Sequence, residues 1–341
     1  MTSRTLTDRA EGLLLGLACG DALGAPYEFD WQKPPTGTGL MAMIGGGLGD
    51  GGTPGGWTDD TAQAATLAEA ITGGDPGVDD GMERFAAGLL AWFADRPPNC
   101  GFHTTRVLTS AGGNPKQLVH GNIDMETTGG SNGSLMRTAP CALVSPQRSI
   151  ALRAALCATA VTHLHADAVN ACVFWTAACH IALWDRQLDF DAALRFIPND
   201  SPLRRIVIEA RHDDPHRWHA INGGARGALA TAVACVTRHP DDPVAAITAA
   251  VRAGGDTDTT AAIVGALVGA LHGASRLPAE WTTDLHGPVY TPDGQRHQYT
   301  AADLTGLAHR ALTATDAGVG AQTIVTATVT VSEGRKPTME P

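Results

Sequence analysis

The sequence predicts an all-α fold, and three observations lead to this prediction. Gly and Ala are abundant while aromatic residues make up only 5% of the 341-residue chain, a composition that suits closely packed helices. Apolar residues recur at helical spacing in one segment after another, and a two-residue alternation occurs only at 326–331. No Pro- or Ser-rich linker divides the body, so we expect one domain over 1–317 and a tail over 318–341.

The first predicted helix begins near Asp8, where Asp8 and Glu11 form a capping box. Glycines recur along it at four-residue spacing, at Gly12, Gly16, Gly20 and Gly24. Residues four apart share one face of a helix, and glycine has no side chain there. We therefore expect another buried helix to approach this face very closely.

The remaining body is a series of predicted helices joined by turns. The Gly/Pro-rich stretch 34–56 is expected to lack regular structure, and 94–134 to form long loops around one short helix. Helices are predicted over 59–71, 82–93, 149–162, 165–184, 189–196, 202–211, 222–238, 243–252 and 258–273. Three states of the tail stay open: an edge strand, a swapped arm and a disordered segment.

The formal net charge of -11 argues against general nucleic-acid binding, which requires basic residues to displace phosphate counterions. It does not exclude an anionic ligand, because a local group of backbone N–H donors can bind an anion in an acidic protein.

The cysteines and the hydropathy pattern predict a cytoplasmic protein. Seven cysteines, an odd number without a C-x-x-C pair, make a disulfide framework improbable in a chain of this length. Three of them lie in Ala-rich apolar stretches and are interpreted as core residues: Cys157, Cys172 and Cys179. The apolar run 13–19 is too short for a signal peptide. No run is expected to reach the roughly 20 apolar residues of a membrane span.

Two similar segments carry the most chemistry. Thr58, Asp59 and Asp60 precede one apolar helix, and 254–260 (GGDTDTT) precede another. Helix capping would explain one such residue in each segment. If the segments meet, however, four carboxylates would repel one another unless cations intervene: Asp59, Asp60, Asp256 and Asp258. Two divalent ions would balance them, and hard oxygen donors favour Mg²⁺ or Mn²⁺ over zinc.

A Gly-rich loop, 128–137 (TGGSNGSLMR), is a candidate anion site, because glycines free backbone N–H groups and serines add hydroxyl donors. It matches neither a P-loop nor a dinucleotide fingerprint, and a surface turn is the alternative. His163 and Asp167 are four residues apart and are expected to share a helix face. A buried structural histidine is the alternative there.

In this combination the motifs resemble the ADP-ribosylglycohydrolases, in particular the bacterial dinitrogenase-reductase-activating type. The matching blocks occur in the family order and span about 12–273: 16–28 (GLACGDALGAPYE), 56–61 (GWTDDT), 132–137 (NGSLMR), 162–163 (TH) and 254–259 (GGDTDT). The resemblance implies a compact orthogonal multi-helix bundle, and an ADP-ribosylhydrolase that reverses protein arginine ADP-ribosylation.

The resemblance also implies roles for particular residues. Two adjacent Mg²⁺ or Mn²⁺ ions would be held by Thr58, Asp59, Asp60, Asp256, Asp258 and Thr259. The ADP-ribose moiety, with its diphosphate on the loop, would be bound by Asn99, Gly129, Gly130, Ser131, Asn132, Gly133, Ser134, Met136 and His163. Glu28 occupies the glutamate position beside the scissile bond. A metal-bound water would attack, and Glu28, Asp59 or Asp258 would take its proton.

One position departs from the family pattern. Members of this type often carry Asp-x-Gly shortly before a Thr-Arg pair, whereas this chain has Asn99 there. An amide cannot pair electrostatically with a guanidinium, so the departure questions the arginine linkage. The alternatives are hydrolysis of serine-linked ADP-ribose or O-acetyl-ADP-ribose, a non-catalytic binder of ADP-ribose, and a crystallin-like structural relative. The intact metal-ligand positions favour an enzyme.

Overall fold

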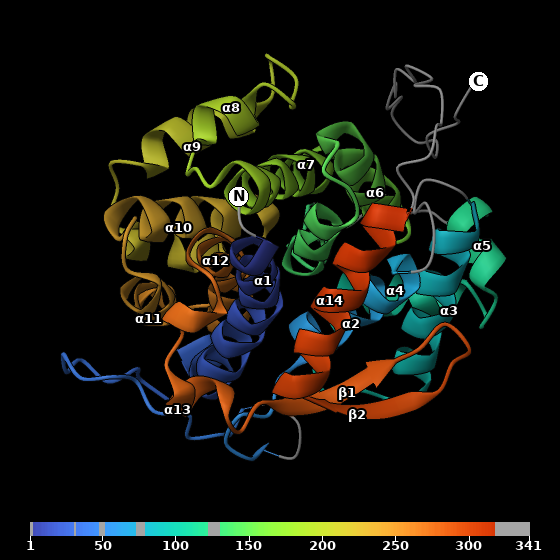
Figure 1. Ribbon diagram of the computed structural model, residues 1–341, viewed down its shortest axis with the longest axis horizontal. Coiled ribbons are helices and arrows are strands. Elements are labelled where there is room, and N and C mark those ends of the chain that lie inside the picture. Colours follow the sequence, from blue (N-terminus) through green and yellow to red (C-terminus); the bar gives the residue numbers. More distant parts are fainter. Residues whose placement is uncertain (1–2, 31, 48–51, 73–78, 122–129, 318–341) are drawn as a thin grey trace.

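The computed structural model describes residues 3–30, 32–47, 52–72, 79–121 and 130–317. The described chain is mostly helical (Figure 1), which confirms the predicted fold class. The α-helices are α1 (Ser3–Gly24), α2 (Asp59–Ile71), α3 (Asp79–Ala94), α4 (Phe102–Ser110), α5 (Pro115–His120), α6 (Arg148–Ala160), α7 (Ala166–His180), α8 (Phe190–Leu194), α9 (Pro202–Ala210), α10 (Ala225–Arg238), α11 (Pro243–Ala253), α12 (Thr257–His272), α13 (Ala279–Thr282) and α14 (Ala301–Ala317). Shorter helical turns are η1 (Ala25–Asp30), η3 (Leu135–Arg137), η4 (Ala139–Leu143), η5 (Ile181–Asp185), η6 (Pro215–Ile221) and η7 (Ala274–Arg276).

The predicted glycine face of α1 packs directly against α12. A Cβ atom added to Gly16 would lie 2.2 Å from the carbonyl oxygen of Gly265, and one added to Gly265 would lie 1.9 Å from that of Gly16. Gly12 and Gly269 oppose each other in the same way. The two backbones are therefore in contact, and any larger side chain would force them apart.

The same stripe joins the end of α1 to the start of α12. A Cβ at Gly24 would lie 2.4 Å from the Cα of Asp258, and the Thr257 hydroxyl donates to the carbonyl of Gly24 at 2.8 Å. The close approach of the two helices thus determines where the acidic residues at these helix ends lie.

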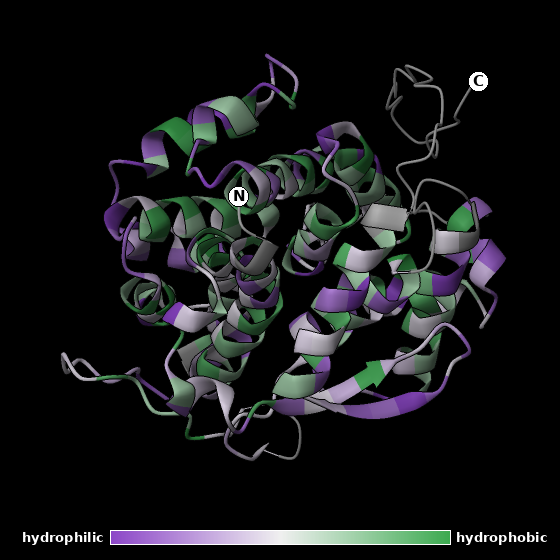
Figure 2. Ribbon diagram, in the orientation of Figure 1, coloured by the Kyte–Doolittle hydropathy of each residue, from purple (hydrophilic) through white to green (hydrophobic). Residues whose placement is uncertain are grey.

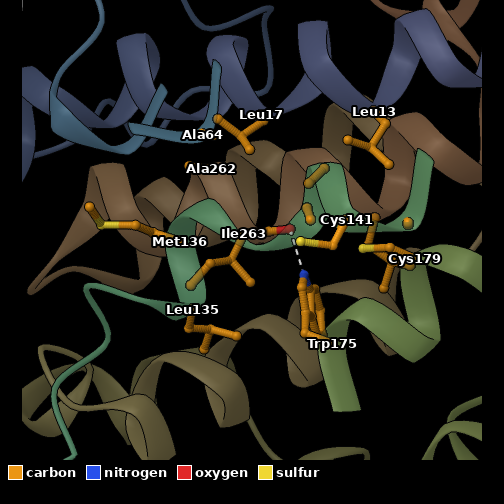
Figure 3. Close-up of a cluster of buried hydrophobic side chains, with 14 of the residues drawn as sticks. Leu13, Leu17, Ala64, Leu135, Met136, Cys141, Trp175, Cys179, Ala262 and Ile263 are labelled. Carbon is orange, nitrogen blue, oxygen red and sulfur yellow. Dashed lines mark hydrogen bonds between the residues drawn. The ribbon is translucent and has the colours of Figure 1, made fainter. Parts of the chain in front are cut away.

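Helix α7 runs through the core and is buried on nearly all sides. Its Trp175 donates from Nε1 to the carbonyl of Ile263 in α12 at 3.2 Å, among apolar side chains from α1, α12 and η3 (Figure 3). Figure 2 shows the apolar residues gathered on the inner helices, while polar residues colour the outer strand β2 (Arg296–Thr300). Cys172 and Cys179 are buried as expected, Cys157 is half-buried, and all seven cysteines are free.

One expectation about hydropathy was wrong. The segment Ala166–Asp185, which is α7 with η5, is long and apolar enough to cross a membrane, yet 89% of its apolar window is buried within the fold. A helix covered on all sides by other helices needs an apolar surface all round, so it passes the same test as a membrane span.

The C-terminal third contains a hairpin that the sequence analysis missed. Strand β1 (His286–Tyr290) pairs antiparallel with β2, with His286 opposite Thr300 and Tyr290 opposite Arg296. The expected absence of strands before the tail was therefore wrong. Because β2 is almost wholly polar and exposed, its sequence has no apolar alternation. The following helix α14 was also missed, and the tail 318–341 lies outside the described residues.

Several predicted boundaries also shift. Helix α1 already includes Ser3, so Asp8 is not its cap; the Asp8 carboxylate instead accepts from the N–H and hydroxyl of Ser275, both at 2.9 Å. Between residues 94 and 134, two helices form, α4 and α5, where one was expected. The helix predicted over 222–238 begins at Ala225, after the turn η6.

Candidate functional site

The two Asp/Thr segments meet, which is the condition on which the metal hypothesis of the sequence analysis depends. The hydroxyl oxygen of Thr58, before α2, lies 2.8 Å from Asp60 Oδ2 and 3.4 Å from Asp258 Oδ2 of α12. These residues are buried, with Asp60 fully excluded from solvent. Thr259 lies beside them and donates its N–H to Asp258 Oδ1 at 2.9 Å.

Helix capping does not explain these residues. Thr58 and Asp256 occupy the N-cap positions of α2 and α12, but neither side chain accepts a capping hydrogen bond from its own helix. The carboxylates instead face one another between the two helices. Both helices direct their positive dipole ends at the cluster, which offsets part of its negative charge.

Asp21 completes the cluster and was not among the predicted site residues. It lies in α1, is fully buried, and accepts four hydrogen bonds: from the N–H and hydroxyl of Thr58 at 2.9 and 2.7 Å, and from those of Thr61 at 2.8 and 2.6 Å. The available signal was a lone carboxylate in the otherwise apolar helix sequence LLLGLACGDALG. Asp21 holds the loop before α2 in place.

The carboxylates form two groups with the geometry of cation sites. Oxygen atoms of Asp21, Asp60 and Asp258 lie within 4.8 Å of one another, as do those of Glu28, Asp256 and Asp258. Asp258 belongs to both groups. Three oxygens of the cluster are buried without a hydrogen-bond partner: Glu28 Oε2, Asp60 Oδ1 and Asp256 Oδ1. Buried orphan oxygens are costly unless something binds them, so the donor set fits divalent cations.

Asp59 lies at the edge of this arrangement. Its side chain is half-buried, it belongs to neither group of three, and its Oδ2 accepts a hydrogen bond from Gln63 at 3.2 Å. The structure thus brings all six predicted metal ligands into one region: Thr58, Asp59, Asp60, Asp256, Asp258 and Thr259. It also shows that the carboxylates of Asp21 and Glu28 could bind a cation there.

The electrostatics of the cluster indicate a site built for positive charge. Burial is the main cause of a raised pKa in every carboxyl of the cluster: Asp21, Glu28, Asp59, Asp60, Asp256 and Asp258. Neighbouring carboxylates add to this effect at Glu28, Asp59, Asp60 and Asp258. For Glu28 the pKa rises to about 8. Divalent cations would remove this repulsion and return the groups to their ionised form.

Glu28 sits on a turn with unusual backbone geometry. It belongs to η1, but its ψ of 137° is not helical, and the next residue, Phe29, has φ 49°. The N–H of Phe29 donates to the carbonyl of Gly255 at 2.9 Å, which fixes this turn to the segment before α12. Glu28 is thereby aimed into the cluster while Phe29 remains exposed. Such strained residues concentrate at functional sites.

The Gly-rich loop is joined to the acidic cluster. Asn132 donates from Nδ2 to Asp256 Oδ2 at 2.8 Å and to the carbonyl of Asn222 at 2.9 Å. Ser131 forms a β-bridge with Gly224. Within the described residues no carbonyl accepts the N–H of Gly133 or Ser134. Gly133 is half-buried and Ser134 is fully buried, so the N–H of Gly133 is the donor that an anion could reach. Gly129 lies outside the described residues.

The other predicted binding residues occupy different depths around this loop. His163 is buried and its Nε2 lies 2.9 Å from the Ser131 hydroxyl. Ser134 is fully buried, and its hydroxyl accepts from the Cys172 thiol at 3.3 Å. Met136 is buried in η3. A Cβ atom at Gly130 would lie 2.9 Å from His165 Nδ1, so a larger residue there would displace the His165 side chain.

The expected helix face shared by His163 and Asp167 does not exist. Helix α7 begins at Ala166, with His165 as its N-cap accepting from the Asp167 N–H at 3.2 Å. His163 precedes the helix, and Asp167 instead pairs with Arg226 at 2.7 Å. A cap signal at His165 was overlooked because histidine rarely fills this position.

Asn99 lies apart from the cluster. It occupies the turn before α4 and is half-buried, and no hydrogen bond in the described chain joins it to the carboxylates. Its neighbour Cys100 is close enough for Asp59 to raise the pKa of that thiol, although burial is the larger cause.

Three further residues organise the site and were not predicted. Asn222 accepts the Asp256 N–H at 3.0 Å and donates to the Gly254 carbonyl at 2.9 Å. Gln63 and Arg137 are buried and hydrogen-bonded to each other at 2.7 Å. Asn222 follows a polar turn, and no sequence pattern marks it as a site residue. Arg137 is a cation in an otherwise apolar segment, and this could have identified it from the sequence.

Fold and site together define a class: a mostly helical protein with a buried carboxylate cluster, suited to divalent cations, beside a Gly-rich loop. The family model of ADP-ribosylglycohydrolases matches residues 2–319. The chain belongs to the ADP-ribosylglycohydrolase family, and the predicted enzyme class, a hydrolase of ADP-ribosyl glycosidic bonds, is confirmed at the level of this family.

Similar proteins support the assignment to this family. ADP-ribosylarginine hydrolase Tri1 of Pseudomonas putida (strain GB-1) is 30% identical over 296 residues, covering 82% of this chain and 75% of that protein. ADP-ribosyl-[dinitrogen reductase] glycohydrolase of Rhodospirillum rubrum is 29% identical, covering 84% and 92%. A solved structure, named an ADP-ribosylglycohydrolase-related protein complex, has a TM-score of 0.68 and 31% identity, covering 92% of this chain and 99% of that one.

Proposed function

We propose that this protein hydrolyses the glycosidic bond between ADP-ribose and an acceptor, with arginine on a modified protein as the first candidate acceptor. The observation that carries the proposal is that the carboxylate cluster and the Gly-rich loop are directly connected. The cluster of carboxylates with orphan oxygens is joined to the anion loop through the Asn132–Asp256 hydrogen bond of 2.8 Å. A ligand with a diphosphate at one end and a ribose at the other matches this arrangement.

The residues would divide the work between binding and chemistry. Asp21, Asp60, Asp256, Asp258 and Glu28 would hold two Mg²⁺ or Mn²⁺ ions, with Thr58, Asp59 and Thr259 beside them. Such ions supply a Lewis acid for ribose hydroxyls and lower the pKa of a bound water. The N–H of the half-buried Gly133, which no carbonyl of the described residues accepts, would bind the diphosphate. The remaining negative charge would stabilise an oxocarbenium-like transition state.

Glu28 is the carboxylate we assign to proton transfer. Among the carboxylates of the two groups of three it is the most exposed, at 8%, and its Oε2 has no partner. Its Oε2 is thus an acceptor that no group of the described chain occupies, and it could take a proton from an attacking water. As a general base it would take a proton from that water, or return one to the leaving group. Asp59 and Asp258 stay alternatives for this step, as the sequence suggested.

Two kinds of acceptor are candidates for the group that is linked to ADP-ribose. Relatives at 30% and 29% identity are named for arginine-linked and dinitrogen-reductase-linked ADP-ribose, and ADP-ribosylhydrolase ARH3 of Bos taurus is 24% identical. Asn99 is the specific observation that favours a second candidate, a conjugate without a guanidinium, because an amide provides no charge to pair with one.

The test is release of ADP-ribose from ADP-ribosylarginine and from O-acetyl-ADP-ribose, with Mg²⁺, with Mn²⁺ and after chelation. Asp258→Asn removes a carboxylate common to both cation groups and should lower the rate by at least about 100-fold. Asp293→Asn, in the exposed hairpin turn, is the matched control and should keep wild-type activity. Metal-independent release, or an active Asp258→Asn, would refute the proposal. ADP-ribose binding without release would identify a non-catalytic relative.

A further inference from the structure

A continuous chain of hydrogen bonds links the acidic cluster to the anion loop through the core. From Asp59 it passes to Gln63 at 3.2 Å and to Arg137 at 2.7 Å. Arg137 then donates to the Thr162 hydroxyl at 2.5 Å. The chain continues from Thr162 to His163 Nδ1 at 2.7 Å, and from His163 Nε2 to the Ser131 hydroxyl at 2.9 Å.

The direction of every bond in this chain follows from Arg137. A guanidinium only donates, so the Thr162 oxygen accepts from Arg137 and must donate its own proton elsewhere. Thr162 is fully buried, and among the described residues the only other hydrogen-bond neighbour of its hydroxyl group is His163 Nδ1. A buried hydroxyl proton without an acceptor is costly. His163 Nδ1 must therefore accept, and the ring proton lies on Nε2.

The remaining proton in the chain belongs to Ser131. His163 Nε2–H donates to the Ser131 oxygen, so the Ser131 hydroxyl proton is not consumed by the ring. Ser131 is half-buried, and in the same loop the N–H of the half-buried Gly133 is accepted by no carbonyl of the described residues. Burial, followed by the charge of Arg137 and the nearby His103, lowers the pKa of His163 well below its usual value, so the ring is neutral and carries one proton.

We propose that Thr162 is a positioning residue that holds His163 as the Nε2–H tautomer, so that Ser131 donates its hydroxyl to the bound diphosphate. The identity of the anion rests on the proposed function; the tautomer does not. With the opposite tautomer, His163 would accept the Ser131 proton and the loop would present an oxygen lone pair to an anion, which is repulsive.

The first test measures the tautomer directly. Long-range ¹H–¹⁵N spectra of the histidine-labelled full chain, with His163 assigned through a His163→Gln variant, report which ring nitrogen carries the proton. We expect a neutral ring with Nε2–H at pH 7, with and without Mg²⁺. An Nδ1–H ring or an imidazolium would overturn the proposal. This measurement requires no hydrolysis and no ligand.

The second test asks whether Thr162 acts through Ser131. Calorimetric titration with ADP-ribose would compare Ser131→Ala, Thr162→Val and the double variant. Each single variant should weaken binding about tenfold, as expected for losing one hydrogen bond to a charged group, and the double variant should be no weaker than Ser131→Ala alone. Thr162→Ser keeps the hydroxyl and should restore the wild-type affinity.

Thr231→Val is the matched control. Thr231 is also fully buried, but its hydroxyl donates to the Gly227 carbonyl within α10, so the affinity should not change. Additive losses in the double variant, or an equal loss in Thr231→Val, would show that Thr162 is merely structural and would overturn the proposal. If the wild type does not bind ADP-ribose, the proposed function fails, together with the role of Ser131, while the spectra still decide the tautomer.

Discussion

Replacing Gly16 by alanine is the sharpest test of how the helix pair builds the site. The added Cβ would lie 2.2 Å from the Gly265 carbonyl oxygen, whereas ordinary contact begins at 3.4 Å. The shortfall is 1.2 Å, from 3.4 minus 2.2, and neither atom can rotate away, because the oxygen belongs to the backbone and Cβ is bonded directly to it. Helices α1 and α12 must therefore separate, which also loosens the contact between Gly12 and Gly269.

The expected cost follows from two opposing effects. Overpacking a tight core costs about 1–3 kcal/mol and sometimes more, and the rigid contact favours the upper end. Alanine gains about 1 kcal/mol over glycine as a helix former. The free energy of unfolding should therefore fall by about 2 kcal/mol or more, and the Tm by several degrees.

Gly306→Ala is the control, because the same substitution on α14 meets only the end of the Arg310 side chain, at 3.6 Å. It should stabilise the protein by about 0.4–1 kcal/mol. Chemical denaturation of both variants and the wild type measures the difference. If Gly16→Ala matches Gly306→Ala within about 0.5 kcal/mol, the close contact of the two helices is not what the structure describes.

Further predictions concern the acidic cluster and Asn99. Glu28→Gln should lower the hydrolysis rate by about 10²–10⁴-fold. In metal-free protein the same variant should be more stable than the wild type above pH 8, by up to about 5 kcal/mol, since the folded pKa of about 8 lies above the usual 4.5. This advantage should vanish below pH 4.5, and an advantage that grows on acidification would contradict the reasoning. Chelation should lower the wild-type stability by about 3 kcal/mol but leave Asp258→Asn unchanged, as thermal melts would show. Asn99→Asp should raise the rate on ADP-ribosylarginine about fivefold relative to O-acetyl-ADP-ribose; an equal change on both conjugates would remove Asn99 from acceptor recognition.

Local pattern was sufficient for much of the fold. Helix α2 has the predicted bounds, and α12 differs from its prediction by one residue at each end. Their acidic starts were also identified as site residues. These elements were predictable because periodic apolar runs and Gly breaks act over a few residues. The β1–β2 hairpin could not be predicted in this way, because it is held by contacts between residues that are far apart in the sequence. One of them is the hydrogen bond of 3.1 Å from the Tyr290 N–H to the Thr66 hydroxyl.

The sequence by itself determined which chemistry this protein carries: the carboxylates, the Gly-rich loop, and the glycine stripe that brings two backbones into contact. Only the tertiary structure decided how these parts are connected. Asp21, Asn222 and Arg137 act on partners at least 25 residues away, so the sequence around them can mark an unusual charge, as at Asp21 and Arg137, but does not reveal which residues they bind. Hydrogen-bond direction and burial are properties of the packed core, because they depend on which donors and acceptors the fold leaves within reach of one another.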